Sequence, residues 1–107
     1  MSRFGDTLER LAAVIESRRG GDPATSWSAK LLADPTLASK KLAEEALEAA
    51  LAAAARDRDA LTAESADLIY HWLVVLALHG ITLDDVAATL EAREGTSGVA
   101  EKASRKP

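Results

Sequence analysis

Two pairs of acidic residues, each spaced by one helical turn, are the residues of this sequence most suited to chemistry. Glu45 and Glu48 lie in "AEEALEAA" (43–50), and Glu64 and Asp67 lie in "AESADL" (63–68). Both pairs stand among alanine and leucine, so they border the apolar face of their segments. Carboxylates held close together repel. At about 6 Å and an effective dielectric constant of about 20, each pair costs roughly 3 kcal/mol.

A divalent cation among the four carboxylates would remove that repulsion. A hard cation accepts oxygen ligands, and these segments offer only carboxylate oxygens. Mg²⁺ keeps part of its water shell and takes further oxygens from phosphate, so the pattern predicts a Mg²⁺ site for phosphate chemistry. Its predicted ligands are Glu45, Glu48, Glu64 and Asp67. The alternative is a solvated helix face whose glutamates pair with Lys40 and Lys41.

Helices must position these acids, because helix start and stop signals recur along the chain. Asp6 with Glu9 resembles a capping box, Asp34 precedes Pro35 at a helix start, and Thr82 with Asp85 forms another capping pair. We therefore expect an all-α domain over residues 1–95 and a disordered tail over 96–107. The predicted helices cover about 6–19, 26–32, 35–56, 59–79 and 83–93.

The third and fourth predicted helices must form an antiparallel hairpin, since only a short turn joins them. At 100° per residue, the acids of both helices fall on or beside the packing face. With the turn near Arg58, Glu48 and Asp67 are predicted at the same height, with Glu45 and Glu64 about one turn to either side. The hairpin thus brings the two acid pairs together.

The core of a 107-residue chain with only four aromatic residues must be thin. Much of the 48% hydrophobic content is alanine, which packs helices closely but buries little area. We therefore expect a second copy to share the core, so that a homodimer completes a four-helix-type bundle.

Composition also disfavours several classes of protein. The net charge is −4 without a clustered basic face, which argues against a nucleic-acid polymer as partner. The chain has no cysteine, so disulfides and thiolate sites are excluded. The start "MSRFGDTLER" is unlike a signal peptide, and the apolar run "LIYHWLVVLAL" (68–78) is too short to cross a bilayer. We expect a cytoplasmic protein that does not contact membranes.

Three longer segments make the interpretation more specific: "SWSAKLL" (26–32), "KKLAEEALEAALAA" (40–53) and "ESADLIYHWLVVLALHGITLDDV" (64–86). Together they resemble the phosphoribosyl-ATP pyrophosphatase family of histidine biosynthesis, over about residues 6–94. The acid pairs match the E-x-x-E and E-x-x-D signature of the wider all-α, MazG-like nucleotide pyrophosphohydrolase superfamily. The resemblance implies a usually dimeric, Mg²⁺-dependent enzyme that hydrolyses phosphoribosyl-ATP to phosphoribosyl-AMP and pyrophosphate.

Further candidates surround the acid pairs, each with a plainer alternative. Glu44 and Glu48 are the candidate catalytic acids, with Glu44 as a general base or else a salt-bridge partner of Lys40 or Lys41. Lys30, Lys41 and His71 are candidates for substrate binding. The lysines are otherwise solvent-exposed or paired, and His71 is otherwise a core residue with satisfied hydrogen bonds. Trp27 either stacks on adenine or anchors its helix.

Two rival functions fit the same helices. A nucleotide house-cleaning enzyme would use the same metal chemistry on other triphosphates. A non-catalytic helical dimerisation module would carry the acids as solvated residues and bind no Mg²⁺.

Overall fold

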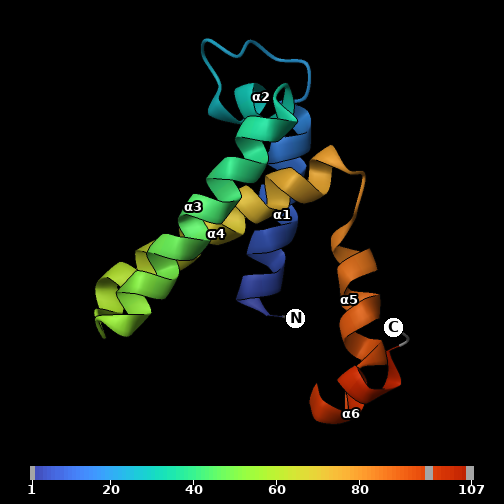
Figure 1. Cartoon of the computed structure of the whole chain (residues 1–107). Coiled ribbons are helices and arrows are strands. Elements are labelled where there is room, and N and C mark those ends of the chain that lie inside the picture. The colour runs from blue at the N-terminus through green and yellow to red at the C-terminus, as the bar shows by residue number, and fades with distance from the viewer. Residues whose placement is uncertain (1, 96–97, 106–107) are drawn as a thin grey trace.

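The fold is entirely helical in the part of the chain that this computed structural model describes, residues 2–95 and 98–105. Those residues form six α-helices and no strand (Figure 1), which confirms the all-α prediction. The helices are α1 (Arg3–Ser17), α2 (Trp27–Leu32), α3 (Pro35–Ala54), α4 (Arg58–Leu78), α5 (Leu83–Ala92) and α6 (Gly98–Ser104).

Two helices, α3 and α5, begin at the predicted caps. The Asp34 side chain accepts a hydrogen bond from the Leu37 amide at 3.1 Å, with Pro35 as the first residue of α3. Thr82 and Asp85 form the expected reciprocal capping box at α5. The first helix differs from the prediction, because α1 begins at Arg3 and Ser2 caps it by accepting from the Gly5 amide. Asp6 lies instead in the first turn of α1, where its negative charge interacts favourably with the positive end of the helix dipole.

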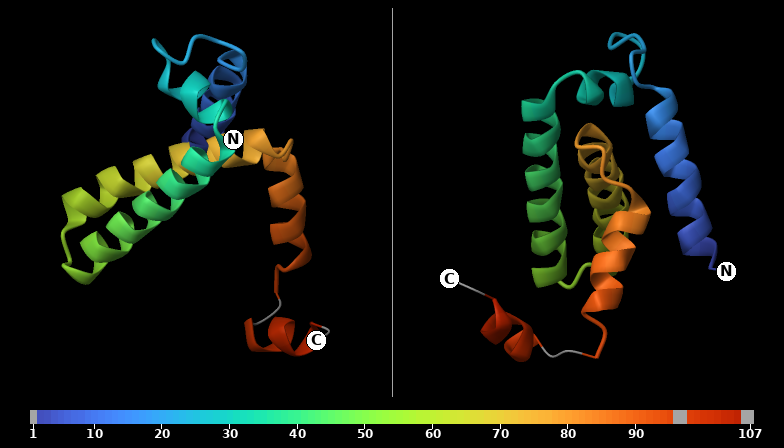
Figure 2. Two further views of the ribbon diagram at one scale, coloured as in Figure 1. Left: turned by 45° about the horizontal axis from the view of Figure 1, so that its top comes forward. Right: turned by 90° about the vertical axis from the view of Figure 1, so that its right-hand side faces the viewer.

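The α3–α4 hairpin is the longest feature of the molecule (Figure 2). Its turn is a Schellman motif, in which the Asp57 amide donates to the Ala52 carbonyl and the Arg56 amide donates to the Ala53 carbonyl. Arg56 has φ +57°, the left-handed conformation that this motif requires. Asp57 then caps α4 by accepting from the Ala60 amide at 3.0 Å. The hairpin therefore turns about Arg56.

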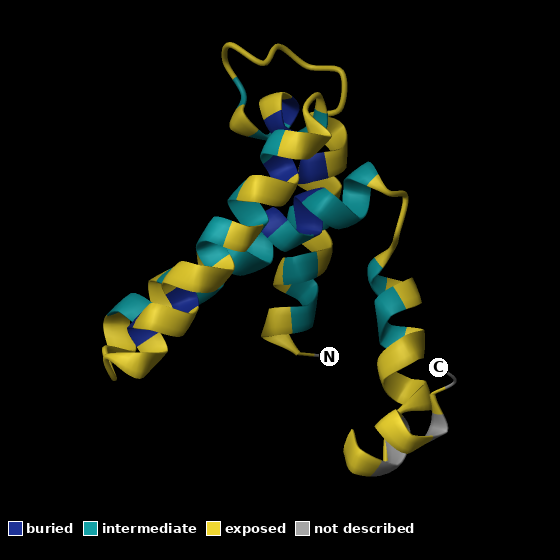
Figure 3. Cartoon of the chain, viewed as in Figure 1, coloured by how far each residue is buried: buried dark blue, intermediate teal, exposed yellow. Residues whose placement is uncertain are grey.

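The core lies at the end of the hairpin away from that turn. There α1 and α2 pack against α4, and α2 also contacts α3. Figure 3 shows the buried residues concentrated at this crossing, with a few near the hairpin tip. The core cluster consists of Ile15, Leu31, Ala38, Leu73 and Val74.

Much apolar surface remains exposed on the single chain. Near the tip of the hairpin, Leu47 and Leu51 are both 60% exposed, while Ala49 and Ala52 are buried against α4. The radius of gyration is 16.0 Å, whereas a compact domain of this length has about 13 Å. The helix α4 is long and apolar enough to cross a membrane, and 17% of its apolar window is buried within the chain. Core helices of soluble proteins share that length and composition. The second copy that would cover the hairpin stays a prediction.

The C-terminal part leaves the body of the molecule after Gly80, and α5 extends away from the hairpin (Figures 1 and 2). Within the segment expected to be a disordered tail, α6 forms a seven-residue helix. Val99, its large apolar residue, is 82% exposed, so α6 gains little from burial. Residues 96–97 and 106–107 of the expected tail lie outside the described residues.

Candidate metal centre

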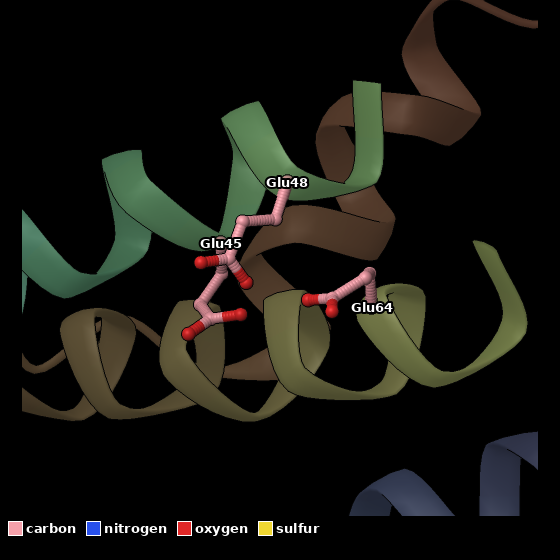
Figure 4. Close-up of side chains that lie close together, drawn as sticks. All are labelled: Glu45, Glu48 and Glu64. Carbon is pink, nitrogen blue, oxygen red and sulfur yellow. The ribbon is translucent and has the colours of Figure 1, made fainter. Parts of the chain in front are cut away.

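Three of the four predicted metal ligands converge between α3 and α4. Glu45 and Glu48 come from consecutive turns of α3, and Glu64 comes from α4, with its side chain directed toward the other two (Figure 4). Each offers one carboxylate oxygen, and these oxygens all lie within 4.8 Å of one another. We call Glu45, Glu48 and Glu64 the acid cluster. Such an arrangement matches the oxygen-only ligand set that Mg²⁺ and other hard cations prefer.

Asp67, the fourth predicted ligand, is exposed and lies outside this group of converging oxygens. The prediction set the turn near Arg58 and paired Glu48 with Asp67. The hairpin turns about Arg56, and the α4 oxygen that converges with those of α3 belongs to Glu64 rather than to Asp67. The height of Asp67 relative to Glu48 stays a prediction. Asp67 stays one turn from the acid cluster on the same helix.

The electrostatics of the acid cluster are those of a site short of positive charge. One oxygen of Glu45 and one of Glu64, the Oε2 atoms, are buried without any hydrogen-bond partner. A side-chain hydrogen bond with Glu48, burial, and the charges of Glu48 and Glu45 raise the pKa of Glu64 to about 7. Native proteins rarely leave buried acceptors unpaired. The donorless oxygens and the raised pKa fit a cation site, since a bound cation would satisfy both oxygens and neutralise the repulsion.

Glu44 does not join the acid cluster. Its carboxylate lies 3.2 Å from the Lys41 ammonium and 4.0 Å from the Lys40 ammonium. These pairs are the salt bridges that the sequence left open as the alternative for Glu44. A base bound by two lysines is not free to accept a proton from water until those contacts change. Lys41, half-buried and one turn before Glu45, places a positive charge beside the acid cluster.

His71 is buried, and its two ring nitrogens face a backbone carbonyl and an indole. Its Nδ1 lies 2.7 Å from the Asp67 backbone carbonyl, and its Nε2 accepts from the Trp27 indole Nε1 at 3.4 Å. The alternative of a satisfied core histidine therefore describes its position best. Lys30 is exposed, with its ammonium 5.6 Å from the centroid of the Trp27 ring, a cation–π arrangement.

Two features had no equivalent in the sequence prediction. Ser28 of α2 and Tyr70 of α4 share a hydrogen bond between their hydroxyl groups at 2.5 Å, which ties the two helices together. A pocket of about 480 Å³ lies between α1, the end of α4 and the start of α5, and its lining includes Glu9, Arg19 and Asp84. No residue of the acid cluster lines that pocket. Hydroxyls and surface charges of this kind carry no spacing signal in a sequence, so neither feature was predictable.

Comparison with known proteins identifies close relatives. The family model described as phosphoribosyl-ATP pyrophosphohydrolase matches residues 8–94. A protein of Caulobacter vibrioides named phosphoribosyl-ATP pyrophosphatase is 65% identical over 103 residues, 96% of each chain. Relatives of the same name from Caulobacter sp. strain K31 and Cereibacter sphaeroides are 62% and 57% identical, covering 98% and 92% of this chain and 98% and 96% of their own.

Proposed function

The chain belongs to the phosphoribosyl-ATP pyrophosphohydrolase family, and we propose that it hydrolyses phosphoribosyl-ATP at a divalent cation held by the acid cluster. The reaction cleaves the bond between the α- and β-phosphates and gives phosphoribosyl-AMP and pyrophosphate, the second step of histidine biosynthesis. Because the close relatives all carry an enzyme's name, the alternative of a non-catalytic dimerisation module has no support.

The observation that carries the metal site is the pair of buried, donorless oxygens on Glu45 and Glu64. We propose Mg²⁺ as the cation, with Glu45, Glu48 and Glu64 as its protein ligands and Asp67 as a further ligand or a hydrogen-bond acceptor for its water. When bound, Mg²⁺ supplies positive charge that neutralises phosphate oxygens and the charge developing on the leaving pyrophosphate.

The residues around the acid cluster have assignable tasks in this proposal. Glu48 is exposed, so its carboxylate would be open both to a cation in the acid cluster and to a water molecule beside the substrate phosphate. Lys41 would bind a phosphate oxygen, and Glu44 would orient Lys41 through their 3.2 Å contact. Glu44 as the general base stays a prediction, tested by the variant Glu44→Gln. Lys30 is proposed to bind a phosphate of the substrate beyond the acid cluster.

A homodimer is the proposed working form of the enzyme. The support is the exposed apolar surface near the hairpin tip, with Leu47 and Leu51 each 60% exposed, and the elongated shape of the single chain. A second hairpin packed against the first would cover those leucines and complete a four-helix-type bundle. We place this biosynthetic enzyme in the cytoplasm, acting on a small nucleotide rather than on a nucleic-acid polymer or a membrane.

The direct test measures pyrophosphate released from phosphoribosyl-ATP, with Mg²⁺ and with excess EDTA. Release that needs Mg²⁺ and is much slower with ordinary nucleoside triphosphates supports the proposal. Equal rates on ATP and phosphoribosyl-ATP would instead favour the house-cleaning activity. Full release in EDTA would contradict the metal site itself.

A further inference from the structure

His71 joins two helices through its two ring nitrogens. The Nδ1 atom lies 2.7 Å from the Asp67 backbone carbonyl, so it carries the proton and donates it. The Nε2 atom is then unprotonated and accepts from the Trp27 indole N–H, at 3.4 Å between nitrogens. Since neither nitrogen is left for a ligand, His71 has no free group with which to bind a substrate.

The helix that receives this contact depends on α4 for its position. α2 has only six residues, and a helix so short is not stable by itself in water. Leu31 and Ala29 bury one side of it in the core. Its polar ties to α4 are the Trp27–His71 contact and the Ser28–Tyr70 hydrogen bond. The indole N–H of Trp27 is therefore tied to α4 through His71.

Trp27 lies on the same side of α4 as the acid cluster. His71 follows Glu64 by seven residues, which places the two side chains within about 20° of each other and about 10.5 Å apart along the helix axis. Trp27 is 42% exposed although its N–H is engaged, so part of its ring remains open to a planar ligand. The Lys30 ammonium beside that ring adds a positive charge.

The region of Trp27 lies along α4 from the acid cluster, on the side toward Lys41 of α3. A nucleotide bound with its phosphates at the acid cluster and its length along α4 would bring its base to that region. An aromatic ring with a cation beside it suits a purine base that carries an anionic phosphoribosyl group. The far end of the substrate therefore matches the chemistry that α2 presents.

We propose that His71 is a positioning residue, which holds Trp27 so that the indole stacks on the adenine ring of phosphoribosyl-ATP. This inference rests on the proposed function of the acid cluster. It reassigns His71 from substrate contact to support of α2, and it names Trp27 as the residue that contacts the base.

Two matched variants separate the two contacts of His71. In His71→Asn the amide can replace Nδ1 toward the Asp67 carbonyl but cannot reach Trp27. In His71→Gln the longer side chain can place its oxygen where Nε2 accepts the indole N–H. We expect His71→Asn to raise KM for phosphoribosyl-ATP about fivefold, the value of one neutral hydrogen bond, with kcat within twofold of wild type. His71→Gln should recover most of the loss. A fall in kcat at unchanged KM would overturn the inference.

A double-mutant cycle tests whether His71 acts through Trp27. Trp27→Phe keeps an aromatic ring and loses the N–H. Because Trp27 is 42% exposed, this variant should fold even where the His71 variants do not. We expect Trp27→Phe to raise KM by about the same factor, and His71→Asn to add little in that background. Trp27→Phe with wild-type KM, or two effects that multiply, would contradict the inference.

Fluorescence provides a measurement independent of the metal. The chain has two tryptophans, so Trp72→Phe leaves Trp27 as the single emitter. In EDTA, phosphoribosyl-ATP should change the Trp27 emission saturably, and His71→Asn should weaken that binding about fivefold. Unchanged emission would overturn the stacking of adenine on Trp27. If instead the emission responds while Glu48→Gln retains full activity, the metal site fails and the Trp27 inference stands.

Discussion

Glu48 of α3 and Glu64 of α4 face each other across the hairpin, with carboxylate oxygens within 4.8 Å. Within the described part of the chain, no basic side chain forms an ion pair with either residue. The result is a Glu64 with a pKa of about 7, mainly through its hydrogen bond with Glu48, and also through burial and repulsion. This pair is the point at which the metal-site proposal can be tested most directly.

Removing one charge of that pair should abolish most of the activity without unfolding the protein. Glu48→Gln keeps the shape of the side chain but loses a ligand charge. We expect kcat/KM for phosphoribosyl-ATP to fall at least about 100-fold, as when a group that stabilises transition-state charge is removed. Glu91→Gln on α5, an exposed glutamate, is the control and should retain wild-type activity. A loss of less than a few-fold in Glu48→Gln would exclude Glu48 as a ligand.

The metal-free protein should become less stable as the pH rises through the pKa of Glu64. In the folded protein the pKa of Glu64 is about 7, whereas its unperturbed value is 4.5. Between pH 4.5 and 7 the folded state therefore binds a proton that the unfolded state does not. The stability that this proton on Glu64 contributes is therefore fully present below pH 4.5, and it is lost as the pH approaches and passes 7. The measurement is thermal unfolding in EDTA from pH 4.5 to 8.

Other groups also titrate over that range, so the comparison is between wild type and Glu64→Gln. The glutamine variant should lack this contribution, and the difference between the two proteins should change with pH in the stated direction. Equal slopes for both proteins would show that Glu64 has an ordinary pKa.

Binding of Mg²⁺ should release protons near neutral pH. A carboxyl with a pKa of about 7 is half protonated at pH 7, and a ligand carboxylate must be deprotonated. Calorimetry in two buffers of different ionisation enthalpy should show release of roughly half a proton per site at pH 7, falling toward zero at pH 8.5. Glu64→Gln should release none. Proton-neutral binding by the wild-type protein at pH 7 would contradict the raised pKa.

The helices could be predicted from sequence because their signals are local. Asp34 before Pro35, and Thr82 with Asp85, each act within four residues of chain, and both caps formed as expected. The start of α1 was misplaced because Ser2 and Asp6 are both good caps, and the earlier one extends the helix. Local rules do not rank two valid caps.

The register of the hairpin could not be predicted as well, since it depends on where the chain reverses. "RDRD" contains no glycine, and Arg56 adopts the left-handed conformation that usually marks a glycine. The turn lies at Arg56, and the acid cluster joins Glu48 with Glu64 rather than with Asp67. The hydrogen-bond partners of His71 were likewise beyond prediction, because Trp27 is 44 residues away in sequence.

The dimer proposal predicts that a charge at the hairpin tip will separate the subunits. Leu51 is 60% exposed on the single chain, and a lysine there would leave an unpaired charge in a packed seam. We expect wild type to sediment as a dimer at micromolar concentration and Leu51→Lys as a monomer. Leu90→Lys on α5, equally exposed, is the matched control and should remain dimeric. A wild-type monomer would refute the proposal.

The turn that sets the register should become more stable with glycine at its left-handed position. Arg56 has φ +57°, a conformation that costs an L-residue about 1 kcal/mol or more and costs glycine little. After the entropy that glycine adds to the unfolded chain, we expect Arg56→Gly to raise the free energy of unfolding by about 0.5 kcal/mol. Arg58→Gly, at the first residue of α4, should lower it by about 0.5–1 kcal/mol, since glycine is a poor helix former. Urea denaturation measures both, and destabilisation by Arg56→Gly equal to that by Arg58→Gly would show that the turn does not lie at Arg56.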